Sequence, residues 1–166
     1  MVVGAWWMMC EVELSTVRAA HIQFTGAWNL TSLGAQLTLP ASKNDPAALG
    51  AARAHRCHCI GSVVPMCPAH ALADQVLLLA RLFADRFVDG KPPLDLPLFP
   101  TVRGEVVEKW AMTETVVSAA RRLGVVDLPD GSQRVTGHSL RCTGAEGLIR
   151  LGWRPDAVQL QGRLAV

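Results

Sequence analysis

Tyrosine is absent from this chain of 166 residues, and aromatic residues of any kind make up only 5% of it. Without a phenol oxygen, the chain itself cannot supply a tyrosine nucleophile for covalent catalysis. Long apolar runs are missing as well, since the richest one, "VLLLARLF", is interrupted by Arg81. It falls short of the roughly 20 apolar residues that a membrane-spanning helix requires. We therefore expect no membrane partner.

The chain has few cysteines, and their number, five, is odd. The opening "MVVGAWWMM" is apolar, but it lacks a basic segment and runs into Glu11 and Glu13, which is unlike a secretory signal. Thiols without such a signal indicate an intracellular, reducing compartment. In such a compartment cysteines serve as thiols or metal ligands rather than as a disulfide framework.

The remaining composition fits a single domain over residues 1–166, because half of the residues are hydrophobic and 18% are charged. The charges are unevenly distributed. Residues 1–120 carry 9 Lys and Arg against 10 Asp and Glu, whereas residues 121–166 carry 7 against 4. This positive excess in the last quarter is a modest indication of a polyanionic partner.

Apolar periodicity predicts a mostly α-helical chain with one small antiparallel β-hairpin or sheet, which is an α+β fold. Helices are expected over residues 4–16, 72–87, 112–123, 138–151 and 155–161, and strands over 20–24 and 35–41. Gly124 is expected to end the third helix. The prolines of 89–100 predict an extended connection, and 128–132 predicts a turn. Residues 40–69, rich in Pro, Gly, Cys and His, are expected to form a loop.

Cysteine and histidine cluster within residues 55–70, "HRCHCIGSVVPMCPAH". The cluster places Cys57, Cys59, Cys67 and His70 as C-x-C, a seven-residue gap and C-x-x-H. Three thiolates and one imidazole suffice for a tetrahedral zinc site, and four protein ligands make its role structural. His55 and His58 are alternative ligands, and the competing interpretation is a loop with spectator thiols.

The segment beginning at Thr136, "TGHSLRCTGAEGLIRLGWRPDAVQLQGRLAV", opens a predicted helix with two cationic donors. His138 and Arg141 share one face at the positive end of the helix dipole, where a phosphate is best bound. The opposite face is expected to be buried, and it consists of Leu140, Gly144, Leu148 and Leu151. Taken alone, a His and an Arg at a helix start are more often simply solvated.

Other motifs accompany this pair, and their order resembles the catalytic domain of the tyrosine recombinase (phage integrase) family. That family has His-x-x-Arg at a helix start, then a glycine, then a short helix ending in glycine. Here these are His138, Arg141, Gly152 and the "AVQLQG" run ending at Gly162. The family's upstream motifs are an arginine three residues before a glutamate, and a β-hairpin carrying a lysine. This chain has "CEVELSTVRAAHI" and "LPASKNDP" in that order.

The resemblance implies DNA recombination or integration, as in mobile elements, through strand cleavage and a 3′-phosphotyrosyl intermediate. By position, Arg141 is the second phosphate-binding arginine and His138 the acid/base. Lys43 is the general acid for the departing 5′-oxygen, and Glu13 is the supporting carboxylate. The implied partner is double-stranded DNA, with self-association on DNA, in the nucleus or another DNA-containing compartment. No organic cofactor is implied.

The chain departs from the family pattern at three places. Cys10 stands where the first arginine is expected, Arg163 and Leu164 stand where a His or Trp is expected, and the tyrosine is missing. One lost oxyanion-type donor costs roughly 3 kcal/mol of transition-state stabilisation, and the lost nucleophile removes the covalent route. We therefore expect a degenerate catalytic domain, truncated at both ends, that binds DNA as a pseudoenzyme. The alternatives are a zinc-stabilised interaction module without enzymatic activity and an inert fragment.

Overall fold

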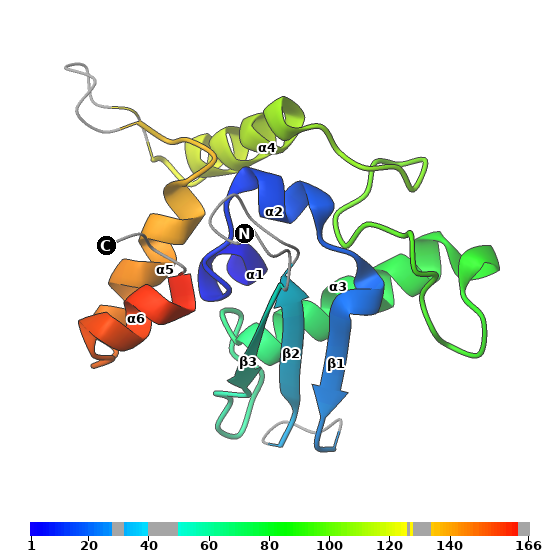
Figure 1. Cartoon of the computed structure of the whole chain (residues 1–166), viewed down its shortest axis with the longest axis horizontal. Coiled ribbons are helices and arrows are strands. Elements are labelled where there is room, and N and C mark those ends of the chain that lie inside the picture. Colours follow the sequence, from blue (N-terminus) through cyan, green and yellow to red (C-terminus); the bar gives the residue numbers. More distant parts are fainter. Residues whose placement is uncertain (28–31, 40–49, 126, 128–133, 163–166) are drawn as a thin grey trace. The chain divides into compact units, whose positions relative to one another are not determined.

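The computed structural model describes residues 1–27, 32–39, 50–125, 127 and 134–162. These residues form an α+β fold with six α-helices and one three-stranded antiparallel sheet (Figure 1). The chain divides into two compact units: a sheet unit, Thr16–Val106, and a helical unit composed of Val3–Ser15 and Val107–Val166. Within the described ranges, no helix combines the length and the apolar character needed to cross a bilayer.

The sheet unit contains an antiparallel meander in the strand order β1 (Ile22–Thr25), β2 (Gly34–Leu39), β3 (Ala51–Arg56). The first two strands confirm the expected hairpin. The prediction of loop throughout 40–69 is wrong at β3. The sequence "AARAHR" lacks the alternation of apolar and polar residues that indicates a strand, because its buried positions are occupied by Arg53 and His55.

Helix α3 (Pro68–Leu82) contacts β2 and β3 and passes behind the sheet in Figure 1. Two residues of its predicted apolar stripe, Leu72 and Leu79, are fully buried. The helix ends earlier than the predicted residue 87, and a short 3-10 turn follows at Ala84–Arg86. The end comes where the backbone of Phe83 leaves the helical conformation, at φ −128° and ψ 41°, while its ring stays buried.

The proline-rich segment 89–100 contains no helix, as predicted, and its backbone pairs with the chain ahead of β1. The amide of Leu98 donates to the carbonyl of Val17, and the amide of Ala19 donates to the carbonyl of Leu96, both at 2.9 Å. Leu96 and Leu98 are fully buried. Gln75 of α3 donates its side-chain amide to the carbonyl of Leu98 at 2.8 Å, which fastens the segment to the helix.

In the helical unit, the prediction of one helix over 4–16 is wrong, because the chain forms two short helices, α1 (Val2–Trp6) and α2 (Glu11–Thr16). Met8 adopts φ +49° after α1, in the left-handed conformation that glycine usually takes at a helix end. The physical reason is burial of three consecutive residues, Trp7, Met8 and Met9. Successive side chains of a helix point about 100° apart, so a helix that buries only one face would leave one of the three exposed.

Helices α4 (Lys109–Arg122), α5 (Ser139–Arg150) and α6 (Pro155–Gly162) confirm the last three predicted helices. Gly124 at φ +76° and Gly152 at φ +86° follow the ends of α4 and α5.

The buried face of α5 contains Leu140, Gly144 and Leu148. Leu148 packs in a core cluster with Met8 of the α1–α2 connection and Val158 of α6. The prediction for Leu151 is wrong: it is 64% exposed, because α5 has ended and the chain turns there. The turn predicted at 128–132 lies outside the described residues.

Candidate functional site

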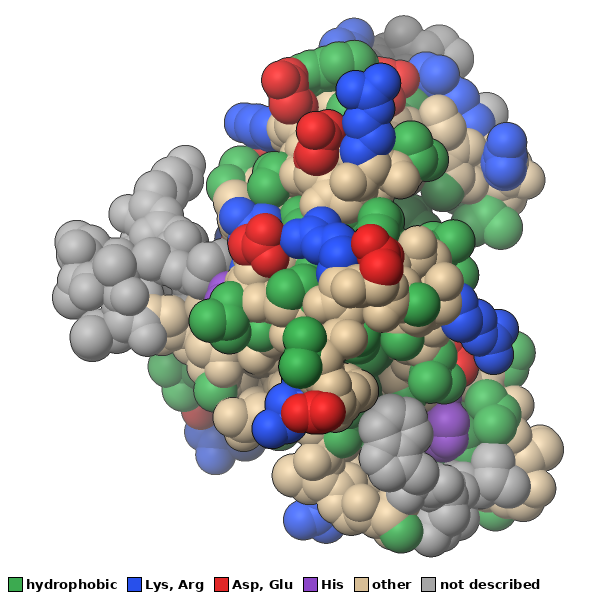
Figure 2. Space-filling view, turned by 90° about the vertical axis from the view of Figure 1, so that its right-hand side faces the viewer, with side chains coloured by type: hydrophobic (Ala, Val, Ile, Leu, Met, Phe, Trp, Pro, Cys, Tyr) green, Lys and Arg blue, Asp and Glu red, His purple; other side chains and the backbone are tan. Residues whose placement is uncertain are grey.

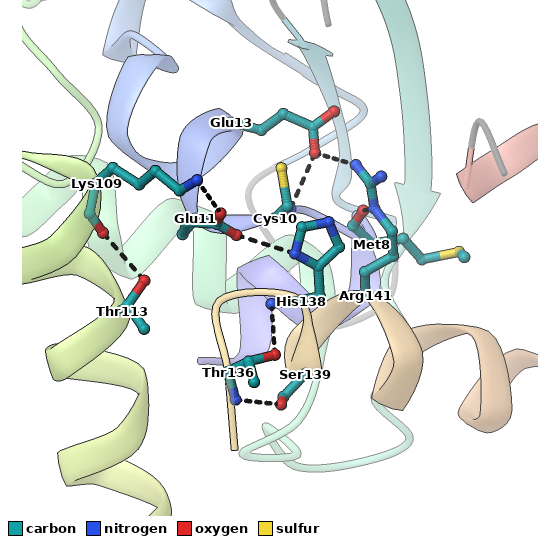
Figure 3. Close-up of polar contacts among 10 residues, drawn as sticks. All are labelled: Met8, Cys10, Glu11, Glu13, Lys109, Thr113, Thr136, His138, Ser139 and Arg141. Carbon is teal, nitrogen blue, oxygen red and sulfur yellow. Dashed lines mark hydrogen bonds and ion pairs between the residues drawn. The ribbon is translucent and has the colours of Figure 1, made fainter. Parts of the chain in front are cut away.

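Two predicted site residues that are distant in sequence meet in the helical unit. Arg141, in the first turn of α5, donates from Nη2 to Oε2 of Glu13 on α2 at 2.5 Å (Figure 3). Its Nε donates to the carbonyl of Met8 at 2.9 Å. The Arg141 side chain is 14% exposed and that of Glu13 is 2% exposed. The guanidinium is therefore held in place by a carboxylate and a backbone carbonyl together.

Cys10 adjoins the same carboxylate. Its backbone amide donates to Oε2 of Glu13 at 3.0 Å, at the position where the resemblance expects an arginine. Burial, above all, raises the pKa of the Cys10 thiol. A neutral thiol cannot make the bidentate, charge-assisted contact that a guanidinium makes to phosphate. Among the described residues, the site therefore has one arginine, Arg141, where the family pattern has two.

His138 is the N-cap of α5, and it faces a carboxylate that the sequence did not single out. Its Nδ1 lies 3.4 Å from Oε2 of Glu11, and the other oxygen of Glu11 lies 3.3 Å from Nζ of Lys109, the first residue of α4. Glu11 is 5% exposed, whereas the side chains of His138 and Lys109 are 60% and 67% exposed. No local motif indicated Lys109, because only tertiary packing brings α4 to this carboxylate.

A glycine makes this approach sterically feasible. The amide of Glu11 donates to the carbonyl of Gly137 at 3.2 Å. A Cβ at position 137 would lie only 2.3–2.7 Å from the carboxylate end of Glu11. The turn into α5 is held by side chains on either side, since Thr136 accepts from the amide of His138 and Ser139 accepts from the amide of Thr136. Backbone and side chains thus position His138 beside Glu11.

Of the four predicted catalytic residues, three come together here: Glu13, His138 and Arg141 (Figure 3). Lys43 lies outside the described residues, in the connection between β2 and β3. Arg163 and Leu164, at the position of the family's His or Trp, are also outside the described residues.

The charges of this site are nearly balanced, because Glu11 faces Lys109 and Glu13 faces Arg141. An anion bound at the site would therefore depend on directed hydrogen bonds more than on a strong positive field. On a different face, the right-hand side of Figure 1, the described Lys and Arg side chains are likewise interspersed with Asp and Glu (Figure 2).

A second cluster, in the sheet unit, contains the four residues predicted as metal ligands. Cys57 follows β3 directly, Cys59 lies two residues further on, and Cys67 and His70 lie at the N-terminus of α3. Their ligand atoms all lie within 4.8 Å of one another. Among the described residues, His55 and His58 are not part of this group. These four side chains could bind a metal ion such as zinc.

The distances in the cluster agree with a tetrahedral site. Nδ1 of His70 lies 3.6 Å from Sγ of Cys57, 3.5 Å from Sγ of Cys59 and 3.3 Å from Sγ of Cys67. Zinc bonds of about 2.3 Å to sulfur and about 2.0 Å to nitrogen place ligand atoms about 3.5 Å apart in a tetrahedron. The distances from the histidine nitrogen to the three sulfurs therefore fit such a site, and all four ligand atoms lie within 4.8 Å of one another.

Backbone amides support the thiols of this cluster. The amide of Cys59 donates to Sγ of Cys57, and the amide of Val64 donates to Sγ of Cys59, both at 3.2 Å. Gly61, at φ +77°, provides the tight turn that directs the second amide back to its sulfur. Such hydrogen bonds orient ligands and stabilise the negative charge of a thiolate.

The thiols differ in acidity. Burial opposes ionisation of Cys67, but hydrogen bonds from His70, from the backbone of His58 and from the side chain of Cys59 together outweigh it and lower the pKa of Cys67 to about 6. Burial and the neighbouring thiols of Cys59 and Cys67 raise the pKa of Cys57 to about 11. One ligand is therefore ready as a thiolate near neutral pH, and Cys57 has to lose a proton when a metal binds.

Comparison with known proteins provides no relative for this chain: no protein-family model matches it, and no curated protein matches it in sequence. The function therefore has to be inferred from the chemistry of the two clusters.

Proposed function

We propose that this chain is a DNA-binding domain of the tyrosine recombinase type that holds duplex DNA without cleaving it. The observation that carries the proposal is the contact between Arg141 and Glu13, which are 128 residues apart in sequence. The resemblance assigns these two residues to one site, and nothing in the local sequence requires them to meet. Their pairing supports a recombinase-like arrangement of α2 and α5.

Arg141 and His138 would contact a phosphate group in this arrangement. A guanidinium has five N–H donors, and the contacts with Glu13 and Met8 use two of them. His138 is largely exposed at the N-terminus of α5, where the helix dipole favours an anion. Phosphate contacts give affinity without base information, so the binding is expected to be sequence-independent and salt-sensitive.

Cleavage is not part of the proposal. The 166 residues contain no tyrosine, and Cys10 replaces the first arginine. A chain without the nucleophile cannot form a phosphotyrosyl intermediate by itself. Lys43 as a further contact and self-association on DNA stay predictions from the resemblance.

Fluorescence anisotropy of a labelled duplex, measured at several salt concentrations, tests the proposal. We expect dissociation constants in the range of about 1–100 μM at physiological salt, increasing with salt. Arg141→Lys keeps the charge but loses the fork of donors, so binding should weaken about tenfold. Arg150→Gln, at the exposed far end of α5, is the matched control and should change little. Absence of binding by folded protein, or equal effects of the two variants, would overturn the proposal.

We also propose that a structural zinc ion binds Cys57, Cys59, Cys67 and His70. The cluster of ligand atoms within 4.8 Å supports this, together with the hydrogen bonds to two of the sulfurs. The ion would tie the end of β3 to the start of α3. The four protein ligands leave no open position for a substrate, so the role is to brace the sheet unit.

Metal analysis and chelation test the zinc site. Purified protein should contain about one zinc per chain, and a strong chelator should lower the melting temperature by roughly 10 °C, equivalent to roughly 3 kcal/mol of stability. A melting curve unchanged by the chelator, with unchanged thiol accessibility, would reject the ion. If zinc binds but DNA does not, the zinc-stabilised interaction module becomes the better account of the chain.

A further inference from the structure

We infer that Lys109 is a third phosphate contact of the helical unit and that Glu11 positions it beside His138. This inference rests on the proposed DNA binding and adds to it a residue that the resemblance does not supply. It follows from the geometry around a single buried carboxylate, which has a cationic or protonatable group at each oxygen.

The two groups at Glu11 come from the starts of two different helices. Nζ of Lys109, on the first residue of α4, lies 3.3 Å from Oε1, and Nδ1 of His138, the N-cap of α5, lies 3.4 Å from Oε2 (Figure 3). The two groups therefore flank one carboxylate. Donors placed in this way can contact the same phosphate group.

The exposed fractions of the side chains distinguish Glu11, which positions its neighbours, from Lys109, which can contact a ligand. The carboxylate of Glu11 is buried, with 5% of its side chain exposed, so it cannot itself meet a ligand. Lys109 is 67% exposed, and its ammonium has three donors, of which Glu11 faces one side. The remaining donors can therefore reach a phosphate oxygen from solvent.

The place of Lys109 in α4 also agrees with an anionic ligand. A cation at the first position of a helix is disfavoured by the helix dipole. Glu11 offsets this cost in the free protein. A phosphate bound beside Lys109 would interact favourably with both the ammonium and the dipole.

A direct test uses the small number of lysines, which are Lys43, Lys91 and Lys109. Reductive methylation with ¹³C keeps their charge and gives separate NMR signals, and Lys109→Gln identifies the signal of Lys109. Adding an unlabelled duplex at low salt should shift the Lys109 signal and leave that of Lys91 in place. A Lys109 signal that does not move while the duplex binds would overturn the inference about Lys109 and leave the proposed DNA binding in place.

Affinity measurements provide the second readout. Lys109→Gln should weaken duplex binding about five- to tenfold near 0.1 M salt and reduce the slope of log K against log salt by about one. Arg122→Gln, in the last turn of the same helix, removes an equal charge and is the control. Equal effects of the two variants would mean that Lys109 acts only through general charge.

Glu11→Gln distinguishes two effects of Glu11 on DNA binding: the positioning of Lys109 and His138, and the contribution of its negative charge to the overall field. Removing a negative charge should strengthen DNA binding if only the overall field matters. If Glu11 positions Lys109 and His138, Glu11→Gln should weaken binding, whereas the exposed Glu114→Gln should not. Stronger binding by a folded Glu11→Gln protein would reject the positioning role. Failure of the wild-type protein to bind any duplex would overturn the proposed function together with this inference.

Discussion

Arg141 and Glu13 form a largely buried ion pair between α5 and α2, and Arg141 also donates to the carbonyl of Met8. The contact joins the first and last segments of the helical unit. A buried carboxylate without its partner is strongly destabilising, since its desolvation is no longer offset.

Arg141→Ala is therefore expected to lower the free energy of unfolding by about 3–5 kcal/mol, measured by urea denaturation. Arg150→Ala is the control, because Arg150 pairs with Glu146 at the exposed surface of the same helix. It should cost less than about 1 kcal/mol. Similar losses in both variants would show that the Arg141 pair is not buried as described.

Two glycines of α5 provide a matched pair of substitutions. A Cβ at Gly144 would lie 2.0 Å from the carbonyl oxygen of Ala5, whereas a Cβ at Gly147 would meet nothing within 4 Å. Gly144→Ala should destabilise the protein by about 1–3 kcal/mol or more, because backbone has to move. Gly147→Ala should stabilise it by about 0.5–1 kcal/mol through helix propensity. Thermal melts of both variants measure these changes in stability. If both substitutions raised or both lowered the melting temperature, the packing of α5 would be contradicted.

The identity of the histidine ligand can be settled by substitution. His70→Ala should lower the zinc content well below one per chain, since its Nδ1 lies 3.3–3.6 Å from three sulfurs. His58→Ala should leave the zinc content unchanged, because His58 is outside the cluster. Metal analysis of both proteins after dialysis provides the measurement. The reverse pattern would assign the ligand to His58.

We expect His21 to make the sheet unit sensitive to acid. Its Nδ1 accepts from the amide of Arg18 at 3.3 Å, and burial, with a contribution from the charge of Arg18, lowers the pKa of His21 below its ordinary value of 6.5. A folded-state pKa below the unfolded value gives stability that is present above about pH 6.5 and is lost as the pH falls through the folded-state pKa.

His21→Asn keeps an acceptor near the amide of Arg18 but does not titrate in this range. The variant should lose less stability than the wild-type protein when the pH is lowered from 7 to 5, as followed by melting temperature. Parallel curves for the two proteins would show that another group accounts for the acid sensitivity.

Several elements could be predicted because their signals are local. Apolar residues at helical spacing predicted α3, α4 and α5, and Gly124 marked the end of α4. The candidate metal ligands could be found in the sequence because they fall within fourteen residues of each other. A short chain segment can bring such ligands together with few constraints from the rest of the fold.

Other features lacked a local signal. Strand β3 was missed because Arg53 and His55 occupy its buried positions. The break between α1 and α2 was missed because a continuous apolar run, "AWWMMC", is equally compatible with one long helix and does not mark where the chain turns. The pairing of Lys109 with Glu11 was missed because the two residues are far apart in the sequence and meet only through packing.

The sequence by itself determined the helices of regular periodicity, the absence of a tyrosine nucleophile and the set of metal-ligand residues, since each depends on residue type and short spacing. Tertiary structure alone decided that Glu13 holds Arg141 and that Glu11 faces both Lys109 and His138. Buried carboxylates require partners, and which cations reach them depends on how helices pack.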